Sequence, residues 1–205
     1  MRAALLELIV PSVCPGCDEP RAEGRPLLCA ACAAALVLLP GLRAVHTAIA
    51  YEGKGAELLR RFKFEHRRDA LRVLLDFLVE RVRGQQFEGV VPVPRHPGRV
   101  RELGVDPTFE LGRDLARRTG QPLWDGVLGR SRPTPTQTGL GPADRRRNVR
   151  RSFRARRAAL RGRSVLLLDD VTTTGATLDE AAVTLREEAG ARRVLRVALA
   201  GTIAL

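Results

Sequence analysis

The sequence predicts an α/β fold, in which a mostly parallel sheet is flanked by helices and a small zinc-ribbon-like module precedes it. Strand-like apolar runs alternate with helix-like amphipathic segments along most of the 205 residues. All four cysteines lie within the first 32 residues, as two Cys-x-x-Cys pairs. A hydrophobic content of 44% is enough for a buried core. We therefore expect a zinc-ribbon-like module over residues 1–40 and an α/β domain over residues 41–205.

The N-terminal segment, residues 1–13, combines a short apolar run with Glu7 and predicts a short amphipathic helix. The run is far shorter than the ~20 apolar residues that a membrane-spanning helix needs. No small-residue cleavage signal follows it. We therefore expect a cytoplasmic protein with no membrane span.

The cysteines form the pairs CPGC and CAAC, which are Cys14 with Cys17 and Cys29 with Cys32. Two such turns can place four thiolates around one zinc ion in a tetrahedral cage. Disulfide bonds are the alternative, but they are typical of small secreted domains. A structural site of four thiolates leaves no open coordination position, so we expect this zinc to stabilise the module and to perform no chemistry.

The first half of the α/β domain begins with a predicted strand at residues 44–50, where apolar residues alternate. Residues 55–82 have helical apolar spacing with a break near His66. The β-branched run at residues 89–94 ends in prolines and predicts a strand that stops at a loop. Asp106 is placed to cap a helix that ends before Gly120.

The second half contains a long stretch, residues 130–148, that is rich in proline and glycine and predicts a mobile loop. A buried strand follows at residues 164–170. A helix is expected over residues 177–191 and a last strand over residues 193–202. This alternation favours right-handed crossovers with helices on both faces of the sheet.

The charge balance is strongly basic, with a net charge of +12 and a pI near 11.2. Such a surface attracts nucleic acids and phosphorylated ligands. Residues 144–163 hold ten arginines and one acid. An arginine-rich surface that is merely solvated remains the alternative, and an aromatic content of 4% offers little for stacking on bases. The candidate nucleic-acid contacts are Arg60, Arg61, Lys63, Arg145, Arg146 and Arg147.

The stretch VLLLDDVTTTGAT, residues 165–177, places two acids and then a threonine-rich loop between a strand and a helix. Small hydroxyl residues around Gly175 allow successive backbone amides to point at one anion, beside the positive end of the helix. The loop lacks both the P-loop lysine and the Gly-x-Gly-x-x-Gly pattern. Asp169 and Asp170 suit the vicinal hydroxyls of a ribose, so a sugar 5-phosphate is the expected ligand.

These residues closely resemble the signature of type I phosphoribosyltransferases, which bind 5-phosphoribosyl-1-pyrophosphate (PRPP). The resemblance implies that Asp169 and Asp170 hold the ribose hydroxyls and that Arg95 lies in the pyrophosphate loop. It also implies Mg²⁺ bound with PRPP, displacement of pyrophosphate at the anomeric carbon, and the loop at residues 130–148 as a lid. The implied contacts of the sugar phosphate are Val171, Thr172, Thr173, Thr174, Gly175, Ala176 and Thr177.

Nearly the whole chain resembles the ComF/ComFC family of competence-associated phosphoribosyltransferase-like proteins. The resemblance rests on the four cysteines and on the blocks at residues 51–64, 91–104 and 136–153. It departs at residues 103–107, where LGVDP stands in place of Arg-Gly-Phe-Asn-Gln, so this chain lacks the side chains that the family commonly has there. The family implies a role in natural transformation, with single-stranded DNA and partners such as a DNA translocase or a recombination loader. The alternative is a metabolic phosphoribosyltransferase acting on a base or an amine.

Overall fold

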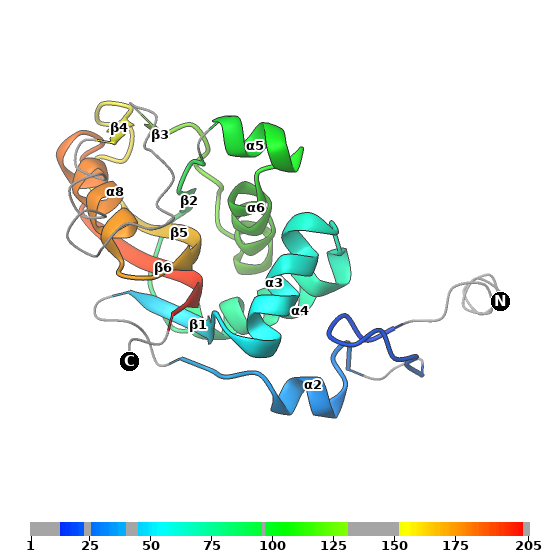
Figure 1. Cartoon of the computed structure of the whole chain (residues 1–205). Coiled ribbons are helices and arrows are strands. Elements are labelled where there is room, and N and C mark those ends of the chain that lie inside the picture. The colour runs from blue at the N-terminus through cyan, green and yellow to red at the C-terminus, as the bar shows by residue number, and fades with distance from the viewer. Residues whose placement is uncertain (1–12, 23–25, 40–44, 96, 131–151, 203–205) are drawn as a thin grey trace, which may run out of the picture.

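A four-stranded parallel sheet forms the centre of the molecule, in the order β1-β6-β5-β2 (Figure 1). Its strands are β1 (His46–Ala50), β2 (Val90–Pro92), β5 (Ser164–Thr172) and β6 (Arg193–Gly201). The two central strands, β5 and β6, are almost continuously buried because both of their faces are covered. The computed structural model describes residues 13–22, 26–39, 45–95, 97–130 and 152–202.

Helices cover both faces of this sheet, as the sequence predicts. The helices α3 (Gly53–Phe64), α4 (Arg68–Val82) and α6 (Pro107–Thr119) share one apolar cluster with Leu166 and Leu168 of β5. The second cluster contains Val165 and Leu167, which point to the other face of the same strand. That face is covered by α8 (Ala176–Glu187) and by a small antiparallel pair, β3 (Leu128–Arg130) with β4 (Phe153–Ala155).

The structure confirms the predicted break in the first helical segment and the predicted ends of the helix after Asp106. The break between α3 and α4 falls at His66, whose φ of 54° lies in the left-handed region. Asp106 caps α6 by accepting the amides of Thr108 and Phe109, and Gly120 ends this helix with a φ of 68°.

Three short elements were not expected from the sequence. Helix α5 (Pro97–Leu103) follows the β2 loop, and β3 and β4 pair across the segment 131–151. Three-residue strands have too few positions to show an alternating pattern, so only their pairing reveals them. The predicted N-terminal helix, most of the loop at residues 130–148, and Arg145, Arg146 and Arg147 lie outside the described residues.

The cysteine-containing module lies beside α3 and α4 (Figure 1). Its short helix α2 (Ala30–Ala34) starts at Cys29, and Leu28 and Leu36 join the apolar cluster of α3 and α4. The chain then returns to the sheet, where Leu38 bridges to Ile49 of β1. Among the described residues, none of the helices is both long and apolar enough to cross a membrane.

Candidate functional site

The two adjacent acids lie at the carboxyl edge of the sheet, where ligands of parallel α/β folds collect. Asp169 and Asp170 are close to the end of β5. The neighbouring strand β2 runs parallel to β5, and the amide of Val93 donates to the carbonyl of Leu168 at 2.8 Å. This register brings Arg95, from the loop after β2, directly beside Asp170.

Asp170 is buried, with 4% of its surface exposed, and two cations hold its carboxylate. Nζ of Lys63 lies 2.7 Å from Oδ2, and the guanidinium of Arg95 donates to the same oxygen. Burial alone would raise the pKa of this carboxyl. The charges of Lys63 and Arg95 outweigh burial and lower the pKa to about 2, so Asp170 is ionised at neutral pH.

Asp169 titrates differently, although it is the neighbouring residue. Burial, followed by the negative charge of Asp170, raises the pKa of Asp169 to about 7. Its Oδ1 accepts the backbone amide of Asp170 at 2.9 Å. The pair therefore holds one permanent negative charge and one that changes near neutral pH, a property typical of functional carboxylates.

The threonine loop turns tightly from β5 into α8. The amide of Gly175 donates to Oγ1 of Thr172 at 3.0 Å, and the amide of Ala176 donates to Oγ1 of Thr174 at 3.4 Å. Gly175 has a φ of 79°, and a Cβ at this position would lie 3.2 Å from Cγ2 of Val45. The positive φ therefore favours glycine here, and a Cβ would in addition crowd Val45. The turn leads directly into the N-terminus of α8, whose peptide dipoles favour an anion.

The remaining residues of this segment differ in exposure. Thr173 is exposed, Ala176 and Thr177 are half-buried, and the side chain of Val171 packs against the apolar cluster beneath the sheet. Val171 can thus act only through its backbone, and its amide donates to Oδ1 of Asp170 at 2.7 Å.

Sequence reasoning did not place two cations, Arg130 and Lys63, in this site. Arg130, on β3, donates from Nε to the carbonyl of Pro94 at 2.8 Å, and its guanidinium lies 4.9 Å from the ring centre of Phe153. Burial lowers the pKa of Arg130, and the charge of Asp169 opposes that effect. Arg130 thus braces the loop that carries Arg95.

Lys63 was expected on a nucleic-acid surface, but the structure buries it against Asp170, with 9% of its surface exposed. The chain did contain a signal for this role. Lys63 and Lys54 are the only lysines among 35 basic residues. A lysine in a chain whose other basic residues are almost all arginines is a candidate for a specific role, because an ammonium and a guanidinium group are not interchangeable.

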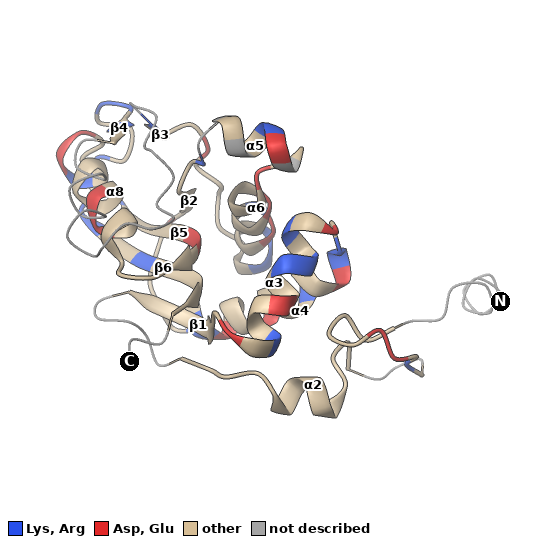
Figure 2. Ribbon diagram, in the orientation of Figure 1, with Lys and Arg blue, Asp and Glu red and all other residues tan. Residues whose placement is uncertain are grey.

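The other expected nucleic-acid contacts are placed as follows. Arg60 exposes 56% of its side chain and pairs with Glu65 at 2.6 Å. Arg61 exposes only 10% and is paired with Asp18 and Glu57, so its charge is not directed to solvent. Figure 2 shows further arginines along the segment that follows β4. The exposed arginines on β4 and in this segment are Arg154, Arg156, Arg157, Arg161 and Arg163.

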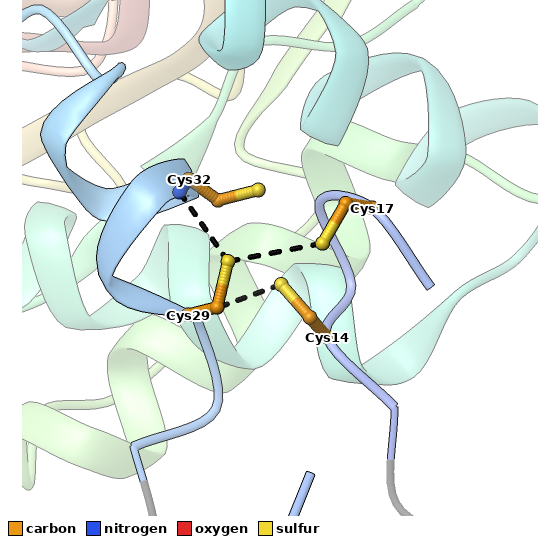
Figure 3. A group of neighbouring side chains, drawn as sticks. All are labelled: Cys14, Cys17, Cys29 and Cys32. Atoms are coloured by element: carbon orange, nitrogen blue, oxygen red, sulfur yellow. Dashed lines mark hydrogen bonds between the residues drawn. The ribbon is translucent and has the colours of Figure 1, made fainter. Parts of the chain in front are cut away.

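The four cysteines converge in space, although two turns of the chain supply them (Figure 3). Their sulfur atoms all lie within 4.8 Å of one another, and Sγ of Cys17 is 3.7 Å from Sγ of Cys29. Tetrahedral zinc–sulfur bonds of about 2.3 Å place sulfurs about 3.8 Å apart, so the cluster fits zinc. The amides of Gly16 and Cys29 donate to Sγ of Cys14, at 3.4 and 3.3 Å. All four cysteines are free thiols, which opposes the disulfide alternative.

Within the block at residues 103–107, Asp106 has a structural role. Asp106 uses its carboxylate to cap α6, with Oδ1 2.9 Å from the amide of Thr108. Its negative charge favours the helix N-terminus and also acts on Arg95 and Arg130.

Comparisons with known proteins give two kinds of relative. "Competence protein F" of Haemophilus influenzae is 32% identical over 139 residues, which cover 63% of this chain and 61% of that protein. "DNA utilization protein YhgH" of Salmonella typhimurium is 30% identical over 179 residues, which cover 83% of this chain and 76% of that protein. A glutamine PRPP amidotransferase structure from B. subtilis has a TM-score of 0.45 at 22% identity, over 69% of this chain and 30% of that one. No protein-family model matches the chain.

Proposed function

Because this chain belongs to the ComF family of competence-related proteins with a type I phosphoribosyltransferase-like fold, we propose that it binds PRPP or a ribose 5-phosphate ligand where β5 and β2 end. One observation carries the proposal. An acid pair, with Asp170 buried and Asp169 partly buried, precedes a tight glycine turn, and that turn opens a helix at the carboxyl edge of a parallel sheet.

In this proposal each part of the ligand has its own partner. Asp169 and Asp170 accept hydrogen bonds from the two ribose hydroxyls. The turn from Thr173 to Thr177 surrounds the 5-phosphate with backbone amides and threonine hydroxyls. Arg95 exposes 23% of its side chain and can turn from Asp170 toward a pyrophosphate.

The chemistry that we propose is displacement of pyrophosphate at the anomeric carbon, in which this chain binds, orients and shields the reactants. Among the described residues, the one cluster of three or more potential metal ligands is the four-cysteine group. We therefore propose that Mg²⁺ arrives with the oxygens of PRPP and neutralises the leaving group, whereas zinc occupies the cysteine cluster as a structural ion.

Calorimetric titration with PRPP tests the binding site. We expect Asp169→Asn to weaken binding at least ~10-fold, equivalent to ~1.4 kcal/mol, because an amide is a weaker acceptor than a carboxylate. Asp125→Asn is the matched control, because Asp125 is an exposed aspartate that bonds to the amide of Gly126. Unchanged PRPP affinity in Asp169→Asn, with the wild type binding, would remove the assignment of the ribose hydroxyls.

We also propose that the protein works in the cytoplasm during natural transformation and contacts incoming single-stranded DNA. The support is the exposed arginine segment after β4 and the naming of the relatives. In the part of the chain that the structure describes, three of these arginines have no carboxylate within ion-pair distance: Arg156, Arg157 and Arg161. Free guanidinium groups on a surface bind phosphates without sequence preference. A DNA translocase or a recombination loader is the kind of partner that this role requires.

Oligonucleotide binding at several salt concentrations tests the DNA role. Each phosphate contact contributes about 0.7 to the salt slope for single strands, so we expect Arg156→Gln, Arg157→Gln and Arg161→Gln together to reduce the slope by about 2. A control variant carries three Arg→Gln changes, at the C-cap of α4 and on α6: Arg83, Arg117 and Arg118. A protein that ignores DNA but releases pyrophosphate from PRPP with a base or an amine would instead be a metabolic phosphoribosyltransferase.

A further inference from the structure

We propose that helix α3 couples the four-cysteine centre to the acid pair, and that Lys63 is the positioning residue through which this coupling reaches Asp170. The proposal rests on the proposed PRPP site. It adds that the four-cysteine module, through α3, fixes the position of Lys63 in that site. It is carried by contacts that α3 makes on two sides.

On one side, α3 holds the first cysteine turn. The guanidinium of Arg61 donates to the carbonyl of Pro15 at 3.1 Å and to Oδ2 of Asp18 at 2.8 Å. Nζ of Lys54 donates to the carbonyl of Gly16 at 2.7 Å. Pro15 and Gly16 lie between two of the cysteine ligands, and Asp18 follows directly. The shape of the cysteine turn therefore determines where the side chains of α3 bind.

The contacts on this side form one network. Glu57 bonds to both Lys54 and Arg61, from successive turns of α3. Arg67, just beyond the helix, donates to Oδ1 of Asp18 at 2.7 Å. Because Arg61 is nearly buried, removal of either Asp18 or Glu57 leaves its charge only partly compensated. The network thus resists a shift of α3 relative to the cysteine turn.

On the other side, Lys63 reaches Asp170 from the last turn of α3. Side chains two residues apart in a helix are separated by about 200° around its axis and therefore lie on nearly opposite faces. Arg61 and Lys63 thus contact different neighbours. Helix α3 therefore lies between the cysteine turn and the acid pair. A displacement of α3 would withdraw Lys63 from Asp170.

Lys63 also determines how freely Arg95 can act. Both cations contact Oδ2 of Asp170. When Arg95 turns toward a pyrophosphate, Lys63 remains beside Asp170. Its positive charge keeps the carboxylate ionised and partly balances the negative charge. Without Lys63, Arg95 is the remaining cation on this oxygen and is held there. Loss of Lys63 should therefore weaken the binding of PRPP more than the binding of ribose 5-phosphate, which has no pyrophosphate.

The first experiment compares Lys63→Met with wild type by calorimetry with PRPP and with ribose 5-phosphate. We expect PRPP affinity to fall at least ~10-fold and ribose 5-phosphate affinity to fall clearly less. Glu65→Gln is the control, because it breaks the exposed Arg60–Glu65 pair next to the same helix and should leave both affinities within about twofold. Equal losses for the two ligands, or no loss, would overturn the positioning role of Lys63.

The second experiment tests the coupling with the cysteines intact. Asp18→Asn removes the charge from the network, and asparagine tolerates the left-handed backbone of this position, where φ is 61°. We expect one zinc per chain as in wild type, a PRPP affinity reduced several-fold, and an Asp170 carboxyl that titrates at higher pH in ¹³C NMR. Retained zinc with unchanged PRPP affinity and unchanged titration would contradict the coupling.

The titration arm separates this proposal from the proposed function. It needs no ligand, so it reports on the contact between Lys63 and Asp170 even if the wild type fails to bind PRPP. Failure of wild-type binding would remove the PRPP site alone, whereas an Asp170 titration that shifts in Lys63→Met but not in Asp18→Asn would remove the coupling.

Discussion

Replacement of Asp169 by asparagine should stabilise the folded chain while it damages the site. The pKa of Asp169 is raised from its ordinary value of 3.8 to about 7. The folded chain therefore keeps a proton that the unfolded chain has already lost, and the stability of the wild type falls as pH rises from about 4 to about 7. Asparagine removes this cost, and its Oδ1 can still accept the amide of Asp170.

The size of the gain follows from the pKa difference. Each unit corresponds to about 1.4 kcal/mol, so the cost of ionising Asp169 reaches at most about 4 kcal/mol above pH 7. Asp169 keeps partial contact with solvent, which screens its charge. We therefore expect a gain of about 2 kcal/mol at pH 8 and about half of that at pH 5.5.

Urea denaturation at these two pH values, with zinc in excess, measures the gain. PRPP titration of the same samples should show the loss of affinity. A variant that is no more stable than wild type at pH 8, or a gain that is the same at both pH values, would refute the burial argument.

Three further predictions concern the cysteine cluster, the glycine turn and the core. Elemental analysis should find one zinc per chain in wild type and a loss of zinc, with a lower Tm, in Cys17→Ser; metal-free wild type or bridged cysteines would oppose the cage. Gly175→Ala should cost about 1–2 kcal/mol in urea denaturation, because alanine is strained at a φ of 79° and its Cβ crowds Val45. Leu166→Ala should cost about 2–5 kcal/mol because Leu166 is fully buried, whereas Val183→Ala, at an exposed position, should change the free energy of unfolding far less.

Features contained within a single turn of the chain could be predicted from the residues alone. Asp106 and Gly120 mark the ends of α6 because a cap and a left-handed residue act on their nearest neighbours. The spacing within CPGC and CAAC brings each cysteine pair together for the same reason. The threonine turn after Asp170 also encodes its own conformation, since Thr172 and Thr174 bond to amides two or three residues away.

Contacts between distant segments could not be predicted in this way, because no periodicity relates Lys63 to Asp170 or Arg61 to Asp18. Burial decided which basic residues serve a site and which face solvent. The acid pair shows this most clearly. Asp169 and Asp170 are identical neighbours, yet the pKa of one is raised and that of the other is lowered. The local sequence supplied two carboxylates at a strand end, and only the helix and loop folded against that end made one of them a permanent charge and the other a titrating one.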